Sequence, residues 1–337
     1  MILTLKRNVS KNDIKRIEKK IKSYGFKAHY SKGASDITIG VIGENAILLR
    51  EFFEADPAVK SIVQISKPYK LASRQVHPED SVISCGKEKI GGGRFTVMAG
   101  PCSVENRANL MKTARMVKKH GATFLRGGAF KPRTSPYSFQ GLGEEGLKYL
   151  AEARKLTGLK IITEVMEISQ IEIVAKYADI MQVGARNMQN FNLLRELGKI
   201  NTPVMIKRGM SATITELLMA AEYVLSEGNQ NVILCERGIR TFTQSTRFTL
   251  DISAVPVLKK ESHLPVIIDP SHSAGVRELV PSLCLAAAAS GADGIIVEAH
   301  HDPKNAFSDA AQTIDEKTFA DIMKKIKPIA KAVGKTI

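Results

Sequence analysis

The sequence predicts a (β/α)8 barrel, the TIM-barrel fold, preceded by a small ferredoxin-like α+β domain. Short apolar runs rich in Val and Ile, each closed by a polar or charged residue, recur from residue 95 onward, and helical patterns fill the gaps between them. Such runs indicate parallel strands buried on both faces. They occupy residues 95–100, 122–128, 160–165, 180–186, 203–209, 231–238, 264–272 and 294–300. Eight strands alternating with helices predict a barrel whose active site lies at the carboxyl ends of the strands.

The first 67 residues follow a different pattern. We expect strands at 2–6, 26–30, 36–42 and 59–66, and helices at 11–24 and 45–53. This βαββαβ order is that of the ferredoxin-like motif. Because residues 1–67 contain no catalytic-looking cluster, we expect them to serve regulation or assembly. Residues 68–94 are predicted to form a linker and a hairpin that caps the amino-terminal mouth of the barrel, and residues 95–337 to form the catalytic barrel.

The composition argues against several classes of protein. The formal net charge is +15, yet the chain has no Trp and only 6% aromatic residues, so it lacks the mixture of basic and aromatic residues that nucleic-acid binding uses. No apolar run is long enough for a membrane span, and the N-terminal residues do not have the pattern of a signal peptide. The four cysteines form no CxxC pair. We therefore expect a cytoplasmic protein that binds small anions, without a nucleic-acid or membrane partner.

The densest chemical signal is the loop that follows the second predicted barrel strand. Three cations and two hydroxyls lie within ten residues of a glycine-containing segment: Arg126, Lys131, Arg133, Thr134 and Ser135. Guanidinium, ammonium and hydroxyl groups together can surround an oxyanion. A solvated basic loop is the alternative for any of these residues alone. Further cations end other predicted strands, which favours a site for two phosphate-sized anions; they are Arg186, Lys207 and Arg237.

A second group of residues predicts a metal site. Cys102 follows the first barrel strand, His272 the seventh and Glu298 the eighth, and Asp309 lies beyond the eighth. Strands one, seven and eight are neighbours in a closed barrel, so these side chains can converge. Thiolate, imidazole and carboxylate ligands suit a borderline divalent metal such as Mn, Fe, Co or Zn. Taken singly, the same residues could be a buried filler, a capping residue and a helix N-cap, and spacing alone leaves both interpretations open.

Several long motifs carry a family resemblance. They read AGPCSVE (99–105), RGGAFKPRTSPYSFQGLG (126–143), VGARN (183–187), IKRG (206–209), CERGIRTF (235–242), DPSHSAG (269–275) and VEAHHDPKNAFSDAAQ (297–312). Together they resemble the 3-deoxy-D-arabino-heptulosonate 7-phosphate (DAHP) synthases, of the type with an N-terminal ferredoxin-like domain. That family condenses phosphoenolpyruvate with erythrose 4-phosphate, the first step of the shikimate pathway to aromatic amino acids. The related 3-deoxy-octulosonate 8-phosphate synthases take a pentose phosphate and usually have Ala-Asn where this chain has Pro132, so the KPRTS form favours a DAHP synthase.

The resemblance also implies roles for individual residues. It assigns the carboxylate and phosphate of phosphoenolpyruvate to Arg126, Lys131, Arg186, Lys207 and Arg237. It assigns the phosphate of the aldose to Arg133, Thr134 and Ser135, and the metal to Cys102, His272, Glu298 and Asp309. Glu164 would neighbour the phosphoenolpyruvate site. Lys131, Cys102 and His272 would be catalytic, and we expect the pKa of Lys131 to be lowered by nearby cations, so that this lysine can shuttle a proton.

The N-terminal domain of the resembling family is allosteric. The resemblance implies feedback inhibition by tyrosine or phenylalanine, with His29, Ser31 and Gly33 near the amino-acid ligand, and a homotetramer. An ordinary β-turn is the alternative for residues 29–33. Two other functions remain open, a 3-deoxy-octulosonate 8-phosphate synthase and a basic binding protein without enzymatic activity.

Overall fold

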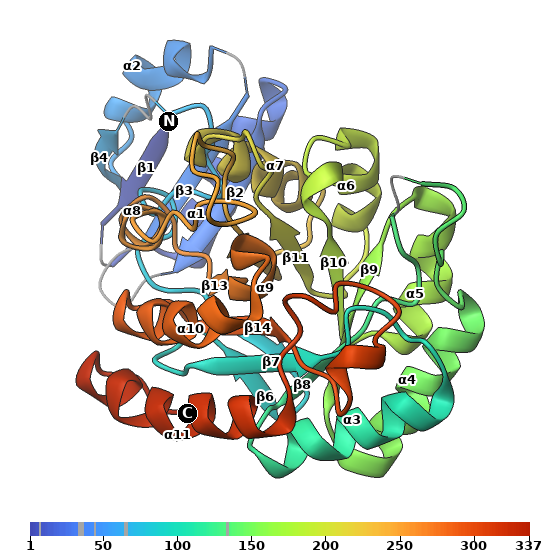
Figure 1. The fold of residues 1–337 in the computed structure, drawn as a ribbon. Coiled ribbons are helices and arrows are strands. Elements are labelled where there is room, and N and C mark those ends of the chain that lie inside the picture. Colours follow the sequence, from blue (N-terminus) through green and yellow to red (C-terminus); the bar gives the residue numbers. More distant parts are fainter. Residues whose placement is uncertain (7, 33–36, 44, 64–66, 133–134) are drawn as a thin grey trace. The chain divides into compact units, whose positions relative to one another are not determined.

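The computed structural model describes residues 1–6, 8–32, 37–43, 45–63, 67–132 and 135–337. The chain divides into two compact units (Figure 1). The first consists of residues 1–80 together with 260–263, and the second of residues 81–259 and 264–337.

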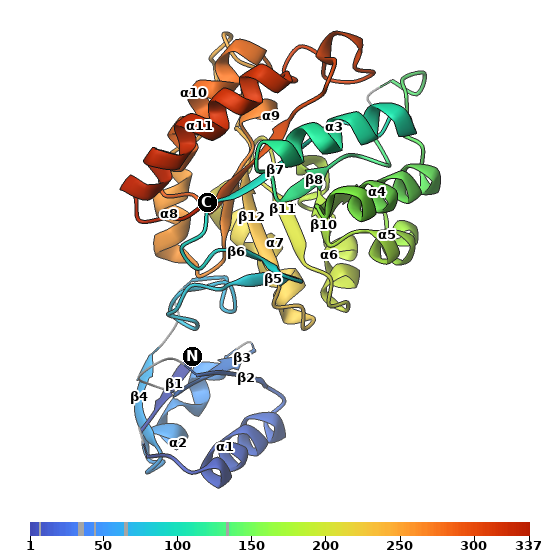
Figure 2. The ribbon, with the colours of Figure 1, turned by 90° about the horizontal axis from the view of Figure 1, so that it is seen from below.

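The first unit contains a four-stranded antiparallel sheet with the strand order β2-β3-β1-β4. Its elements are β1 Ile2–Leu5, α1 Lys11–Ser23, β2 Lys27–Lys32, β3 Ile37–Ile42, the 3-10 helix η1 Ala46–Leu49, α2 Arg50–Glu54 and β4 Val59–Val63. The order of strands and helices confirms the ferredoxin-like prediction. Figure 2 shows α1 and α2 on one face of the sheet, and Leu3, Ile17, Ile39 and Phe53 form the core between these layers.

The predicted helix at 45–53 differs in detail from the observed structure. Its first turn, Ala46–Leu49, is a 3-10 helix, and the α-helix begins only at Arg50. Asn45 precedes this turn with a left-handed φ of 59° and gives no side-chain cap. By contrast, Ser10 and Asp13 form a capping box that fixes the start of α1.

The second unit is a closed parallel barrel, which confirms the predicted fold class. Its strands are paired in the circular order β10-β11-β12-β13-β14-β7-β8-β9 within the described part of the chain. They are β7 Thr96–Gly100, β8 Phe124–Arg126, β9 Lys160–Val165, β10 Ile180–Val183, β11 Val204–Lys207, β12 Val232–Glu236, β13 Val266–Ile268 and β14 Gly294–Glu298. The ring closes because β14 pairs with β7.

Helices cover the outside of the barrel (Figures 1 and 2). They are α3 Arg107–Lys119, α4 Glu144–Thr157, α5 Ile171–Tyr177, α6 Phe191–Gly198, α7 Ile214–Ser226, α8 Ala254–Glu261, α9 Pro270–Ala274, α10 Val280–Ala289 and α11 Glu316–Ala332. Short 3-10 helices follow three of the strands, namely η2 Ile168–Gln170, η3 Ala185–Asn187 and η5 Pro303–Asn305, and a further one, η4 Arg277–Leu279, lies between α9 and α10.

A hairpin of β5 Ile83–Cys85 and β6 Glu88–Ile90 packs at the amino-terminal end of the barrel. Ile83, Cys85 and Ile90 share one buried cluster with side chains near the starts of the barrel strands, such as Phe124 and Ile180. Apolar side chains therefore fill this end of the barrel, and the polar chemistry is left to the opposite end.

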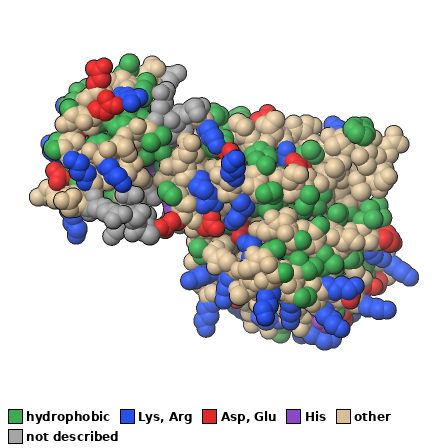
Figure 3. Space-filling view, turned by 90° about the vertical axis from the view of Figure 1, so that its left-hand side faces the viewer, with side chains coloured by type: hydrophobic (Ala, Val, Ile, Leu, Met, Phe, Trp, Pro, Cys, Tyr) green, Lys and Arg blue, Asp and Glu red, His purple; other side chains and the backbone are tan. Residues whose placement is uncertain are grey.

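Many basic side chains lie on the face of the molecule that Figure 3 shows. Figure 3 shows Lys and Arg side chains scattered among apolar and uncharged polar ones, with several along the lower part of the barrel unit. Among the described residues, no helix has the length and apolar character needed to cross a membrane.

Candidate active site

A cavity of about 620 Å³ lies at the carboxyl ends of the barrel strands. Among the described residues that line it, cations outnumber carboxylates, which are Glu164 and Asp309. The cations are Arg126, Lys131, Arg186, Lys207, Arg237, Arg240 and Arg247. A concave site with this charge favours small molecules that carry several negative charges.

The strands hold most of the predicted cations rigidly. Arg126 ends β8, Lys207 ends β11 and Arg237 directly follows β12, and all three are buried. Arg186 lies on η3 after β10 and is exposed. Two of these three buried cations have anionic partners in the protein: Arg126 donates to Glu298 at 2.7 Å, and Lys207 pairs with Asp269.

Two guanidinium atoms in the cavity wall have no partner among the described residues. They are Nε of Arg126 and Nη1 of Arg237, and both are buried. Burial lowers the pKa of Arg237 despite the nearby charge of Asp269. The guanidinium of Arg237 lies 4.3 Å from the centre of the Phe248 ring, which holds it by a cation–π contact. A bound anion would satisfy both donors and offset the desolvation of the cations.

Lys131 reaches into the site from the loop after β8. Its Nζ donates to Sγ of Cys102 at 2.8 Å and lies 3.4 Å from the carbonyl oxygen of Cys102. The prediction of a lowered pKa for Lys131 is wrong. Burial does lower this pKa, but the interactions with the side chain of Cys102 and the carboxylate of Glu298 outweigh burial and raise it. Lys131 is therefore an ammonium donor in this structure.

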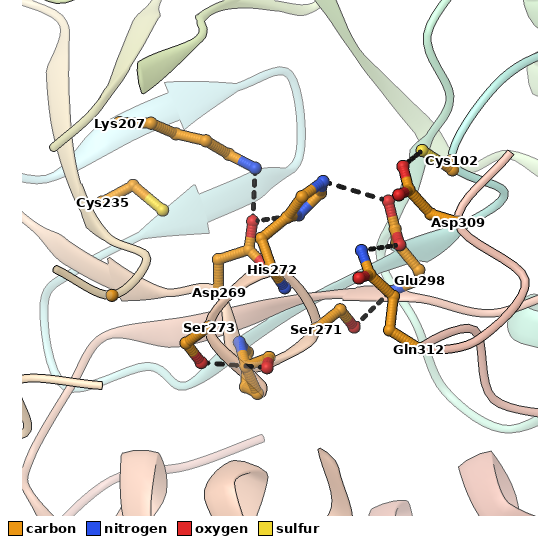
Figure 4. A network of polar contacts seen from close by, with 12 residues as sticks. Cys102, Lys207, Cys235, Asp269, Ser271, His272, Ser273, Glu298, Asp309 and Gln312 are labelled. Atoms are coloured by element: carbon orange, nitrogen blue, oxygen red, sulfur yellow. Dashed lines mark hydrogen bonds and ion pairs between the residues drawn. The ribbon is translucent and has the colours of Figure 1, made fainter. Parts of the chain in front are cut away.

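The structure brings together the four residues predicted as metal ligands (Figure 4). One potential ligand atom from each of Cys102, His272, Glu298 and Asp309 lies within 4.8 Å of those of the others. The thiol of Cys102 donates to Oδ2 of Asp309 at 2.8 Å. Nε2 of His272 lies 3.3 Å from Oε1 of Glu298. One sulfur, one nitrogen and two carboxylates fit a borderline divalent cation.

Asp269 orients the imidazole of His272 towards this cluster. Oδ2 of Asp269 lies 2.8 Å from Nδ1 of His272, and Oδ1 accepts from the backbone N–H of His272 at the start of α9. This leaves Nε2 facing Glu298, the arrangement that metal-binding histidines usually have. Burial by itself would raise the pKa of Asp269, but the charges of His272 and Lys207 outweigh it and hold the pKa well below its usual range.

Glu298 is an ionised carboxylate at the centre of the cluster. It accepts from Arg126 through Oε1 and from Gln312 through Oε2, each at 2.7 Å. Burial would raise its pKa, but the charges of His272, Arg126 and Lys131 lower it to about 2. The pKa of Cys102 moves the other way: burial and then the charge of Glu298 raise it to about 12. A divalent cation would supply the positive charge that converts this thiol to a thiolate ligand.

The other predicted residues have different positions. Glu164 lies on β9, lines the cavity and accepts from Gln182 at 3.2 Å. Ser135 lines the cavity too, whereas Arg133 and Thr134 lie outside the described residues. In the first unit His29 is half-buried on β2, where burial and then the charge of His77 lower its pKa. Ser31 belongs to β2 but its side chain is not described, and Gly33 lies outside the described residues.

Arg240, Arg247 and Asp269 belong to the site but were not predicted from the sequence. Arg240 and Arg247 line the cavity from the loop after β12, and Nη1 of Arg247 lies 3.4 Å from Asp309. Arg240 stands within the CERGIRTF motif, so counting all cations in that motif would have found it. Asp269 opens the DPSH turn before His272, and its position three residues ahead of a ligand histidine was the available signal.

Comparisons with protein families and curated proteins give matches over both units. Residues 70–332 match the family described as "DAHP synthetase I family", and residues 1–67 match the "DAHP synthase ferredoxin-like domain". The chain is 52% identical over 334 residues to the phospho-2-dehydro-3-deoxyheptonate aldolase of Thermotoga maritima, with 99% of each chain covered. It is 32% identical over 268 residues to a 2-dehydro-3-deoxyphosphooctonate aldolase of Geobacter sulfurreducens, which covers 73% of this chain and 97% of the relative.

Solved structures give the same result. A crystal structure of the phospho-2-dehydro-3-deoxyheptonate aldolase (DAHP synthase) of Thermotoga maritima has a TM-score of 0.80 at 51% identity, with 99% of this chain and 98% of that chain covered. A truncated form of the 3-deoxy-D-arabino-heptulosonate 7-phosphate synthase of Thermotoga maritima has a TM-score of 0.75 at 51% identity and covers 80% of this chain and 98% of its own.

The burial of the cysteines leads to a prediction for thiol reactivity. Cys85, Cys102, Cys235 and Cys284 are all buried free thiols, and burial is the first cause that raises the pKa of each. At pH 8 a thiol with a pKa of about 12 is ionised in about one molecule in ten thousand. We expect chelator-treated native protein to react with an aromatic disulfide reagent about a thousandfold more slowly than unfolded protein, which should titrate all four thiols. A thiol that reacts rapidly in the native protein would contradict the burial described here.

Proposed function

Since the chain belongs to the DAHP synthetase I family and is an enzyme with DAHP synthase activity, we propose that it condenses phosphoenolpyruvate with erythrose 4-phosphate in a metal-dependent reaction. The products would be DAHP and inorganic phosphate. DAHP synthase activity is the first step of the shikimate pathway to aromatic amino acids. The observation that carries the proposal is a strongly cationic cavity beside a cluster of sulfur, nitrogen and oxygen ligands.

The cations of the cavity would bind and orient the two substrates. In this proposal phosphoenolpyruvate is held by Arg126, Lys131, Arg186, Lys207 and Arg237, with Glu164 beside it. The phosphate of the aldose is held by Arg133, Thr134 and Ser135. Fixed cations offset the repulsion between two anionic substrates and keep the reacting carbons close together. The unpartnered donors on Arg126 and Arg237 support this assignment, because a buried anion would satisfy them.

The chemical steps follow from the two substrates. Carbon 3 of phosphoenolpyruvate attacks the aldehyde carbon, and the aldehyde oxygen takes up a proton. Water adds to carbon 2 and loses its protons, and its oxygen becomes the carbonyl of carbon 2 as the C–O bond to phosphate breaks and phosphate leaves with the bridging oxygen. Lys131 keeps its proton in the free site and is placed to donate it. Cys102, His272, Glu298 and Asp309 would hold Mn, Fe, Co or Zn, which supplies Lewis acidity when bound.

One assay separates the candidate reactions. Phosphate release from phosphoenolpyruvate should depend on erythrose 4-phosphate and should be at least about tenfold slower with a pentose 5-phosphate. Equal or faster release with the pentose phosphate would favour an octulosonate-type synthase, the activity named for the Geobacter relative. Salt-dependent binding of a polynucleotide without any phosphate release would favour a binding protein instead.

The metal assignment predicts a specific loss of activity. Chelation should abolish turnover, and Mn²⁺, Co²⁺ or Zn²⁺ should restore it to different degrees. Cys102→Ala removes one ligand and should lower turnover and metal affinity by more than about a hundredfold. Cys284→Ala is the matched control, since Cys284 is an equally buried cysteine on α10 outside the site. Metal content and phosphate release would be measured for both. A metal-free Cys102→Ala protein with full activity would overturn the assignment.

We also propose that residues 1–67 regulate the enzyme. They would bind tyrosine or phenylalanine near His29, Ser31 and Gly33 and thereby inhibit the barrel, and the protein would act as a homotetramer in the cytoplasm. The match of residues 1–67 to the ferredoxin-like domain of DAHP synthases supports a regulatory domain. Because these residues have a core of their own, they can respond to a ligand as a unit.

Removing the first unit should separate catalysis from regulation. A chain that begins at Ser81 should retain activity with both substrates but should not respond to tyrosine or phenylalanine, whereas at least one of them should inhibit the full chain. His29→Ala in the full chain should weaken this inhibition without changing the uninhibited rate. Initial rates at increasing amino-acid concentration give the measurement. If the truncated and full chains respond alike, the first unit serves assembly and the regulatory proposal fails.

A further inference from the structure

Two loops that carry members of the metal cluster also contact each other through side chains that the proposed function does not use. The Cys102 loop, residues 101–105, follows β7. The Asp309 loop, residues 300–313, leaves the barrel after β14 and returns before α11. Its base is closed by backbone hydrogen bonds on either side of the bridge between Ala299 and Ile314. Asp309 therefore lies in a loop that extends from the barrel, and not at the end of a barrel strand.

The Cys102 loop is held to the barrel by its backbone. The N–H of Val104 donates to the carbonyl of Gly128 at 2.9 Å, and the N–H of Gly128 donates to the carbonyl of Cys102 at 3.2 Å. These bonds continue the parallel pairing of β7 and β8 beyond the ends of both strands. The thiol of Cys102 is thus positioned almost as firmly as a strand residue.

Among the described residues, the Asp309 loop has no strand pairing at Asp309 itself. Arg277 holds the residues that follow it, through its backbone N–H to the carbonyl of Ala311 at 2.9 Å and its side chain to the carbonyl of Ala310 at 2.7 Å. The loop's regular structure, within the described residues, is limited to the single turn η5. Asp309 itself has a φ of 52°, in the left-handed region that residues other than glycine rarely adopt. Such a conformation persists only where the surroundings hold it in place. The position of the Asp309 carboxylate must therefore come from contacts outside its own backbone.

On the side before Asp309, two contacts with the Cys102 loop contribute to this support. Oγ of Ser103 lies 2.7 Å from Oγ of Ser308, and both serines are buried. Oε1 of Glu105 accepts from the backbone N–H of Phe307 at 2.6 Å. With the bond from Cys102 to Asp309, the residues of the two loops pair in reverse order: 102 with 309, 103 with 308 and 105 with 307.

The other side of the Glu105 carboxylate is also fixed. Oε2 accepts from Nδ2 of Asn109 at 3.4 Å and lies 3.7 Å from Nε2 of His300, and the side chains of Glu105 and His300 are each 2% exposed. Since Asn109 belongs to α3 and His300 begins the Asp309 loop, Glu105 links the outer helix, the Cys102 loop and both parts of the Asp309 loop.

We propose that Ser103 and Glu105 are positioning residues that hold Asp309 against Cys102 and so set the affinity of the site for its divalent cation. This inference rests on the proposed metal dependence. Without the two contacts, the Asp309 loop would populate arrangements in which its carboxylate is away from the other three ligands. Loss of such supporting contacts typically weakens metal binding by about 10–100-fold.

Cobalt binding to the full chain tests the proposal. Chelator-treated protein is titrated with Co²⁺, and the thiolate-to-cobalt absorption band in the near ultraviolet reports ligation by Cys102. Ser308→Ala and Glu105→Ala should each weaken Co²⁺ binding by about 10–100-fold. Glu105→Gln keeps an oxygen acceptor for the N–H of Phe307 and should retain most of the affinity. Ser290→Ala is the control, because it removes a hydroxyl at the end of α10, outside the site, that donates to the carbonyl of Ala287 at 2.8 Å.

The outcomes are distinguishable. At saturating Co²⁺ the variants should recover the KM for phosphoenolpyruvate, and the metal-free melting temperature of Ser308→Ala should match that of Ser290→Ala, since its role is in positioning rather than in folding. Wild-type affinity in both Ser308→Ala and Glu105→Ala, with the thiolate band present, would overturn the positioning role alone. Absence of the band in the wild-type protein would overturn the metal site as well. If Glu105→Ala does not fold, Ser308→Ala decides the question.

Discussion

The buried carboxylate of Glu298 is the charge around which the rest of the site is arranged. It ends the last barrel strand, and its backbone N–H is held by Ser271. Arg126, from a strand two places along the barrel, binds one of its oxygens, and Gln312 binds the other. An unpaired charge at this depth would destabilise the protein by about 3–5 kcal/mol. The barrel therefore folds with these partners in place, and the site is formed before any substrate arrives.

Asp269 repeats this arrangement on the neighbouring strand end. It pairs with Lys207 and orients His272, so two buried carboxylates fix one lysine, one arginine and one histidine. The cations that these carboxylates neutralise account for only part of the positive charge in the cavity. Arg186, Arg237, Arg240 and Arg247 also line it, and Arg237 keeps an unpartnered donor among the described residues. The surplus charge is therefore oriented towards the space where anions would bind, which is the preorganisation that charged transition states require.

The sequence predicts the features that depend on periodicity and on where strands end. It does not predict the features that depend on contacts between side chains. The barrel order and the ferredoxin-like order follow from the spacing of apolar runs and helical patterns. The convergence of Cys102, His272 and Glu298 follows from parallel strands that end at one rim. The raised pKa of Lys131 does not follow from these patterns, because it depends on the interactions of this lysine with the side chain of Cys102 and the carboxylate of Glu298. Arg247 was not predicted for a related reason. It lies in the loop after β12, well beyond the end of that strand, and the spacing of residues in a loop does not indicate where a side chain points.

A barrel gives precise positions to groups on strand ends but not to groups on long loops, and this site uses both. Cys102, His272 and Glu298 follow directly from strands or from the short helix after β13. Asp309 belongs to a long loop and has a strained backbone, yet its carboxylate lies beside Cys102. Contacts between two loops must then supply the precision that the strands give elsewhere. The residues beside Cys102 in the AGPCSVE motif consequently have a physical function of their own. Ser103 and Glu105 connect the well-ordered end of β7 to the loop that contains Asp309, the fourth residue of the cluster.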